Sequence, residues 1–136
     1  MLRPQGGCRR ASLGALQMTV TFTMPGVVPS LKNQKRIGQG RIYDDIQIVA
    51  YKRTFALLVP SRCRNLRLGG PRAHLKLSVR LYHDSWRRDA DIAIVADCLQ
   101  AAGVIANDRW IRVFEIDARA IDSDNPRAEI VIEELG

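Results

Sequence analysis

Two aspartates in the sequence Arg-Asp-Ala-Asp, Asp89 and Asp91, are followed by a third, Asp108, after a segment of helical character. Residues two apart on an extended segment project to the same side, so Asp89 and Asp91 are expected to face one way. Asp108, at the far end of a short helix, can fold back onto them. Three carboxylates held together repel one another unless a cation lies between them. Mg²⁺, which prefers oxygen ligands, is the expected ion.

A cation held in this way can polarise a phosphodiester and lower the pKa of an attacking water, which is the chemistry of a nuclease. The acidic residues are flanked by three arginines: Arg87, Arg88 and Arg109. Their positive charge is what a phosphate substrate needs. An ordinary structural role also stays open, in which Asp91 caps the helix that follows it while Asp89 and Asp108 lie in turns.

The composition favours a polyanionic partner. The chain has 21 Lys and Arg residues against 14 Asp and Glu, a formal net charge of +7 and a pI near 9.9, and arginine far outnumbers lysine. Because the planar guanidinium suits bidentate contacts with phosphate, nucleic acid is the favoured partner. The alternative is a basic protein that uses its charge only for solubility.

Hydrophobic periodicity predicts the strands that must position these residues. Alternation over residues 19–24, 74–82 and 128–133 is typical of strands with one buried face. Residues 110–120 carry apolar side chains on both faces, which indicates a strand in the middle of the sheet. At 136 residues the chain suits one compact domain, and its pattern predicts an α/β (α+β) fold with a mixed sheet of about four to five strands and two main helices.

Two helices are predicted. The first covers residues 43–59, with Asp44 or Asp45 as its N-cap. Its buried face is expected to consist of four residues at helical spacing: Ile48, Tyr51, Phe55 and Leu58. The second helix begins after Asp91 as N-cap and stops at Gly103.

Basic residues follow the first strand, which Pro25 and Gly26 end. The polar connection after it contains four cations: Lys32, Lys35, Arg36 and Arg41. Such a turn, close to a strand end, is suited to gripping a phosphate backbone, and a solvated surface loop is the alternative. A second loop, residues 61–72, has four arginines and is a further candidate contact with DNA.

The remaining features concern location. Three cysteines, an odd number without short paired spacing, argue against a disulfide framework and a zinc site, so a reducing, cytoplasmic location is predicted, with Cys98 in the core. No apolar run approaches the roughly 18 residues of a membrane span, and no membrane partner is expected. Residues 1–17 are predicted to be a disordered or non-native extension, with a targeting peptide as the alternative, and residues 18–136 to be the domain.

The order of these features resembles the RusA family of Holliday junction resolvases, found in bacteria and prophages. The motifs that carry the resemblance are Arg88-Asp89-Ala90-Asp91, Asp97-Cys98-Leu99, Ala102-Gly103-Val104-Ile105 and Asn107-Asp108, with an opening strand and basic turn at residues 25–33. The resemblance implies a homodimer that binds four-way DNA junctions in recombination and repair, in association with the nucleoid. It further implies symmetric cleavage of these junctions with Mg²⁺ or Mn²⁺.

The resemblance also assigns residues to roles. The family's catalytic, metal-binding aspartates fall on Asp89, Asp91 and Asp108, and its basic DNA-contacting position falls on Arg88. The full set expected to bind DNA is Lys32, Asn33, Lys35, Arg36, Arg87 and Arg88.

One departure from the family pattern lies at the start of the second helix. The family has an asparagine after the second aspartate and a lysine about one helical turn later, whereas this chain continues Ile-Ala-Ile-Val-Ala and is about two residues shorter. Losing such a cation typically costs about a hundredfold to a thousandfold in rate. The expected function is therefore a metal-dependent endonuclease that resolves four-way junctions. A catalytically impaired junction-binding relative is the alternative, and a basic RNA-binding domain is a third reading.

Overall fold

Alternating apolar residues place β5 (His74–His83) inside the sheet. Its inward side chains are buried, as predicted: Leu75, Leu77, Val79 and Leu81. Antiparallel β7 (Arg127–Leu135) pairs with one edge of β5, and parallel β6 (Ile111–Ile121) pairs with the other. The computed structural model describes residues 7–10, 18–30, 35–38, 41–44 and 46–135.

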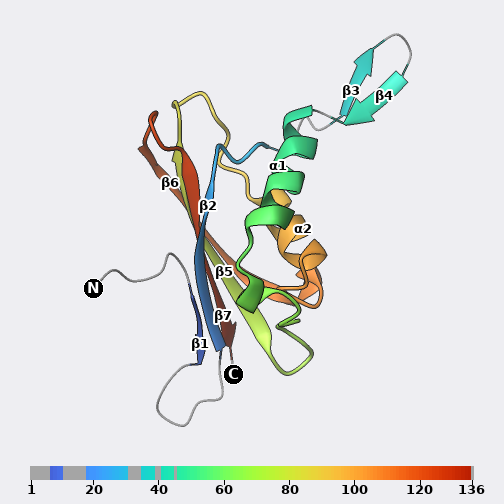
Figure 1. The fold of residues 1–136 in the computed structure, drawn as a ribbon, viewed down its shortest axis with the longest axis vertical. Coiled ribbons are helices and arrows are strands. Elements are labelled where there is room, and N and C mark those ends of the chain that lie inside the picture. The colour runs from blue at the N-terminus through green and yellow to red at the C-terminus, as the bar shows by residue number, and fades with distance from the viewer. Residues whose placement is uncertain (1–6, 11–17, 31–34, 39–40, 45, 136) are drawn as a thin grey trace.

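The sheet continues from β7 to β2 (Met18–Pro25) and then to β1 (Gly7–Arg10), in the order β1-β2-β7-β5-β6. Two helices, α1 (Ile46–Leu58) and α2 (Ala93–Ala101), cover one face of this mixed sheet (Figure 1). The predicted α+β fold is confirmed. Strand β1 falls within the segment predicted to be an extension. Neither helix of the described residues has the length and apolar character of a membrane span.

The helix layer stops short of β6. Phe22, Ile130 and Val79 form one row across β2, β7 and β5, and all three are buried. Ile116 continues this row on β6 but is 44% exposed. The prediction of a central position for residues 110–120 was therefore wrong, because β6 is an edge strand whose apolar side chains remain partly in solvent.

Helix α1 begins later than predicted. Residues at the expected start form β4 (Arg41–Asp44), which pairs with β3 (Lys35–Gly38) in a separate two-stranded sheet where a loop was expected (Figure 1). Asp44 therefore lies in a strand and not at the N-cap, and Asp45 lies outside the described residues. At the other end, the Arg64 guanidinium donates a hydrogen bond of 2.5 Å to the carbonyl of Ala56, which satisfies a terminal acceptor of the helix.

The buried face of α1 differs from the prediction at one position. Ile48, Tyr51 and Phe55 are buried as expected, but Leu58 is 52% exposed and Val59 is buried in its place. Val59 donates its backbone N–H to the carbonyl of Phe55 just after the last helical residue. The helix therefore ends by turning Val59, and not Leu58, into the core.

Phe55→Ala is expected to lower the free energy of unfolding by about 3–5 kcal/mol. Phe55 is fully buried and its ring meets that of Phe22 edge to face, with centroids 6.0 Å apart. Leu58→Ala on the same helix is the matched control and should change the free energy by less than about 0.5 kcal/mol. Urea unfolding measures both values. Equal losses would show that α1 packs through another face.

Candidate functional site

A pocket of about 380 Å³ opens between the start of α2 and β6. Three carboxylates line it: Asp91, Asp97 and Asp108. Most of the remaining lining is apolar and includes Phe114 and Ile116, which are half-exposed on β6. The structure thus brings two predicted site residues, Asp91 and Asp108, to one cavity. Asp97, which was not predicted as a site residue, lies there with them.

Asp91 organises the N-terminal turn of α2. Its Oδ1 accepts a hydrogen bond of 3.0 Å from the backbone N–H of Ala93, and its Oδ2 accepts one of 3.0 Å from the hydroxyl of Ser30. The N-cap position is occupied by Ile92, so Asp91 acts one residue earlier than predicted. The structural role that the sequence left open is present, and the same side chain also lines the pocket.

Asp108 is held at the pocket by its neighbours. It begins the short 3-10 helix η3 (Asp108–Trp110), and its backbone N–H donates to Oε1 of Gln100 at 2.8 Å. The side chain of Asn107 caps η3 by accepting from the N–H of Arg109 at 3.0 Å. Gln100 lies on α2, so this bond fixes the position of Asp108 relative to the helix that carries Asp97.

Asp89 is exposed and is not among the residues that line the pocket. The backbone N–H of Asp91 donates to the carbonyl of Asp89 at 3.1 Å, and a bond between residues two apart forms a γ-turn. The extended alternation that would point both side chains the same way is therefore absent here. In the described part of the chain, no three His, Cys, Asp or Glu side chains lie close enough together to hold a metal ion.

The arginines before the pocket are on the surface. Arg88 makes a bidentate pair with Asp84, at 3.0 and 3.1 Å, which holds the pKa of that carboxyl below its usual range. Arg87 is exposed. The other predicted DNA-binding residues give no side-chain geometry: Lys32 and Asn33 lie outside the described residues, and for Lys35 and Arg36 only the backbone of β3 is described.

The position of the family's asparagine is occupied by a core residue, Ile92, which is 3% exposed. Within residues 46–135, no Lys or Arg lines the pocket. The sequence lacks the asparagine and the lysine of the family pattern, and the described lining of the pocket likewise has no basic residue. The described lining of the cavity consists of acidic and apolar side chains.

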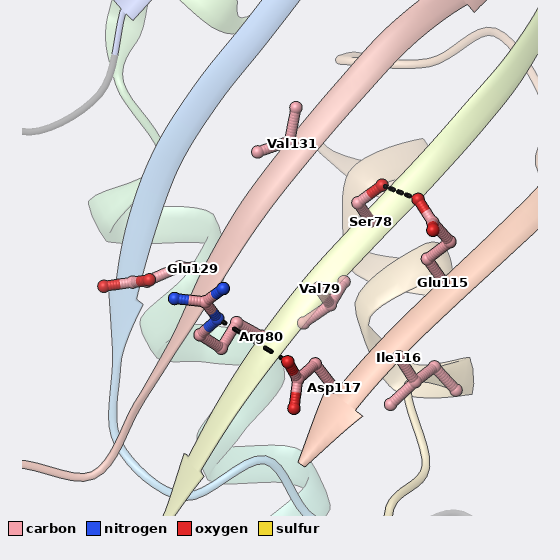
Figure 2. A pocket seen from close by; sticks show the side chains of 8 residues that line it. All are labelled: Ser78, Val79, Arg80, Glu115, Ile116, Asp117, Glu129 and Val131. Atoms are coloured by element: carbon pink, nitrogen blue, oxygen red, sulfur yellow. Dashed lines mark hydrogen bonds and ion pairs between the residues drawn. The ribbon is translucent and has the colours of Figure 1, made fainter. Parts of the chain in front are cut away.

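A second pocket, of about 480 Å³, lies on the face of the sheet that the helices leave open (Figure 2). Two cations that the structure describes on this face are paired with carboxylates. Lys76 Nζ is 2.8 Å from Glu115 Oε1, and Arg80 Nε is 3.9 Å from Asp117 Oδ2. The Lys76 ammonium lowers the pKa of Glu115. Because their positive charges are largely neutralised, Lys76 and Arg80 are poor partners for phosphate.

His83 is the buried polar residue at the end of β5. It is 3% exposed, and its Nε2 has no hydrogen-bond partner among the described residues. Burial, with the nearby charge of Arg88, lowers the pKa of this imidazole, while Asp84 opposes the shift. His74, at the start of the strand, is exposed, so the two histidines face opposite sides of β5.

Lowering the pH from about 7 to about 5 is therefore expected to destabilise the fold. The unfolded chain protonates His83 near pH 6.5 more readily than the folded chain does, so stability present above that pH is lost below it. Carboxyls with lowered pKa values, such as Asp84, contribute only at more acidic pH. His83→Leu should flatten the fall in urea unfolding free energy over this range, and His74→Asn should not. If the unfolding free energy of His83→Leu fell with pH as much as that of the wild type, the pH dependence would belong to other groups.

The cysteines differ from the prediction. Cys98 is a free, buried thiol, as expected, and burial raises its pKa to about 11. Cys63 is fully buried and disulfide-bonded, where no disulfide was expected. Cysteine spacing alone missed it, because distant positions in the sequence can meet in the fold. The spacing therefore gives no evidence on the redox compartment, and the cytoplasmic location stays a prediction.

Sequence comparison adds no family assignment. No protein-family model matches the sequence, and no curated protein is significantly similar to it. The resemblance to RusA resolvases therefore rests on the motifs around Asp91 and Asp108 themselves.

Proposed function

We propose that this chain is a metal-dependent endonuclease that acts on branched DNA, as RusA resolvases do. The observation that carries the proposal is the pocket beside α2, where Asp91 and Asp108 come together from distant positions in the sequence. Asp97 adds a third carboxylate to the lining. Three acidic side chains that line one pocket of a chain with net charge +7 support a site that receives a cation.

The donor set suits a hard divalent cation such as Mg²⁺ or Mn²⁺. Mg²⁺ usually keeps several waters and is held by one or two carboxylates together with substrate phosphate, so a closed cage of three ligands is not required. Asp91 and Asp108 would hold the ion, with Asp97 beside them. When bound, it would polarise the scissile phosphodiester and activate water. Phe114 and Ile116 would limit the access of bulk water on one side.

The distribution of charge supports a DNA substrate on the pocket side of the molecule. On the open sheet face, Lys76 and Arg80 of the described residues are engaged in ion pairs, so we place the phosphate contacts on another surface. We assign backbone contacts to Lys32, Asn33, Lys35, Arg36, Arg87 and Arg88. The pair between Arg88 and Asp84 is partly exposed, and exposed pairs contribute little to stability. Binding of phosphate by Arg88 would require Arg88 to exchange Asp84 for the phosphate, and this contact rests on the family motif.

Resolving a four-way junction requires two matched nicks. A homodimer with one pocket per subunit supplies two equivalent sites related by a two-fold axis, which matches the symmetry of the junction. We therefore propose a homodimer as the active form, and nucleoid-associated DNA in recombination and repair as its substrate. This assembly predicts nicks at symmetric positions on opposing strands.

A second candidate function is junction binding without cleavage. The observation that favours it is the lack of Lys or Arg in the described lining of the pocket, where the family has a lysine near the scissile phosphate. Ile92, buried in the core, also cannot provide the polar contact of an asparagine. Both candidates predict tight binding to a junction, and they differ only in metal-dependent cleavage.

The experiment that tests the proposal compares three labelled substrates at equal salt: a mobile four-way junction, a linear DNA duplex of the same sequence, and single-stranded RNA. Binding is measured by fluorescence anisotropy, and cleavage by denaturing gel with Mg²⁺. The proposal predicts preferential binding and paired nicks of the junction. Tight binding without nicks would favour the second candidate, and displacement of the junction by RNA would favour an RNA-binding domain.

A further inference from the structure

We propose a second DNA contact outside the acidic pocket: an arginine patch formed by Arg67, Arg72, Arg109 and Arg112. The inference rests on the proposed function, in that the ligand is taken to be DNA, and adds a surface that the family motifs do not include. All four side chains are exposed. They come from two segments that are distant in sequence and tied together in the fold.

Backbone hydrogen bonds join the two segments. The N–H of Arg67 donates to the carbonyl of Gly103 at 2.9 Å, and the N–H of Ala106 donates to the carbonyl of Leu68 at 2.8 Å. Leu68 is buried and forms a parallel bridge with Ile105. The arginine-rich loop is therefore anchored to the connection that leads from α2 to η3, and Arg67 is carried by that anchored segment.

An aromatic stack extends the same connection. The rings of His74 and Trp110 lie parallel, 12° apart in orientation with centroids 6.5 Å apart, and the guanidinium of Arg109 lies 5.0 Å from the centre of the Trp110 ring. Arg112 donates to the carbonyl of Arg109 at 3.4 Å. The start of β5, where the loop ends, is thereby fixed against η3, and Arg109 and Arg112 are held beside each other.

The turn that carries Arg72 is also defined. Gly70 and Ala73 exchange backbone hydrogen bonds of 3.1 and 3.2 Å across it. Gly69 lies so close to Trp110 that an added Cβ would come within 2.9 Å of the Trp110 Cβ. The tip with Arg72 therefore returns directly to the strand that begins at His74, next to the stack.

Charge separates this patch from the open face of the sheet. No ion pair of the described residues includes any of the four arginines, and no acidic residue occurs in the sequence between Asp45 and Asp84. On the open face, by contrast, Arg80 is drawn toward Asp117 (Figure 2). Unneutralised guanidinium groups grouped on one surface are the electrostatic footprint of a phosphate backbone.

The backbone conformation of Arg67 also supports a role for its side chain in binding. Its φ is +50°, in the left-handed region that glycine and asparagine adopt readily and that a long side chain adopts at an energetic cost. Asn65, two residues earlier, has φ +62° and is of a type suited to it. An arginine kept in a strained conformation while its side chain is exposed and outside any ion pair of the described residues indicates a use for the guanidinium.

The patch also adjoins the acidic pocket. Asp108 lines the pocket, and Arg109 follows it directly on η3. A DNA backbone bound at Arg109 is therefore led toward the carboxylates. The patch would hold an arm of the substrate beside the pocket, next to Asp108.

The test uses Arg67→Gln/Arg72→Gln in the full chain. Binding of a labelled four-way junction is measured by anisotropy over a series of KCl concentrations. Each lost phosphate contact lowers the slope of log K against log[salt] by about 0.9, so the double variant should lose about 1 to 2 in slope and about tenfold in affinity. Lys76→Gln/Arg80→Gln removes the same charge from the paired face and should leave the slope unchanged.

A second variant distinguishes function from structure. Arg67→Gly relieves the left-handed strain, so it should weaken junction binding while the melting temperature stays equal or rises. If Arg67 had a structural role, the junction affinity and the melting temperature of Arg67→Gly would both fall. Arg67→Lys/Arg72→Lys keeps the charge and should keep most of the slope.

The outcomes also separate this inference from the proposed function. A wild-type protein that binds and nicks the junction, with equal slopes in the wild type, the patch variant and the control, would overturn the patch alone. A wild-type protein without salt-dependent binding to any DNA would overturn the proposed function and the patch together. Equal loss of slope in both double variants would reduce the effect to net charge and overturn the patch.

Discussion

Asp97→Asn lowers the rate constant for metal-dependent junction cleavage by about 100-fold or more, whereas Asp89→Asn lowers it by less than about tenfold; these are the expected results if the pocket is the reaction centre. Asp97 lines the cavity with Asp91 and Asp108, and Asp89 does not. Asparagine keeps the shape of aspartate but removes the charge that attracts a cation. Single-turnover cleavage of a labelled junction in Mg²⁺ measures both rate constants.

Asp124→Asn is the matched control, because Asp124 is an exposed carboxylate in the turn before β7, outside the pocket. It should cleave at the wild-type rate. Junction affinity should be retained or rise slightly in all three variants, since each removes a negative charge that repels phosphate. Full activity in Asp97→Asn with loss in Asp89→Asn would restore the ligand set that the family motif implies and contradict the pocket geometry.

Ala93→Lys is expected to raise the cleavage rate by about 100-fold, the lower end of what a cation at the scissile phosphate contributes. Ala93 is exposed and lines the pocket at the first turn of α2, so a lysine there can reach the space between the carboxylates. The substitution places a cation near a helix N-terminus, which costs about 0.3–1 kcal/mol of stability. Single-turnover cleavage in Mg²⁺, with a thermal melt, measures both effects.

Ala101→Lys adds the same charge at the exposed C-terminal end of α2, away from the pocket. It should leave the rate within about twofold, apart from any gain in affinity. Equal acceleration by the two lysines would assign the effect to DNA binding. No acceleration by Ala93→Lys would show that the absent lysine is not what limits catalysis.

The parts of the fold that sequence predicts well are those with one buried face. Strand β5 follows the alternation of Leu75, Leu77 and Val79, because a strand with two different faces has only one register that buries its apolar side. The limits of strand β6 were predicted to within one residue, but its position at the edge of the sheet was not. Apolar residues on both faces are compatible with a central strand and with an edge strand left partly exposed. The sequence carries no local signal for which neighbours a strand obtains.

The start of α1 and the basic turn were missed for a related reason. Tyr43 and Asp44 were included in the helix because an aspartate can serve as its N-cap, yet they pair with β3, and such pairing depends on a partner strand that periodicity does not reveal. At the other end, Leu58 and Val59 are both apolar, so the last turn alone decides which of them enters the core. Boundaries of elements are therefore less predictable than their interiors.

The candidate site, like the fold, was predicted only in part. Asp91 and Asp108 were predicted together because one lies before a short helix and the other after it, and the structure places both at one pocket. Asp97 had an available signal, since it lies in one of the motifs that carry the family resemblance, Asp97-Cys98-Leu99. Asp89 was misplaced because a γ-turn interrupts the extended segment, and a turn of this kind has no sequence signature here.

The measurement that tests the acidic pocket most directly is cleavage of a labelled mobile four-way junction by excess protein, in Mg²⁺, in Mn²⁺ and in chelator, with wild type and Asp91→Asn/Asp108→Asn side by side. The expected result is paired, symmetric nicks in both metals, and none in chelator or in the double variant, whose junction affinity is retained. Nicks that persist in chelator or in the double variant would contradict a metal-dependent centre at this pocket. Absence of nicks in the wild type and in Ala93→Lys alike, with tight junction binding, would contradict the nuclease and leave a junction-binding protein.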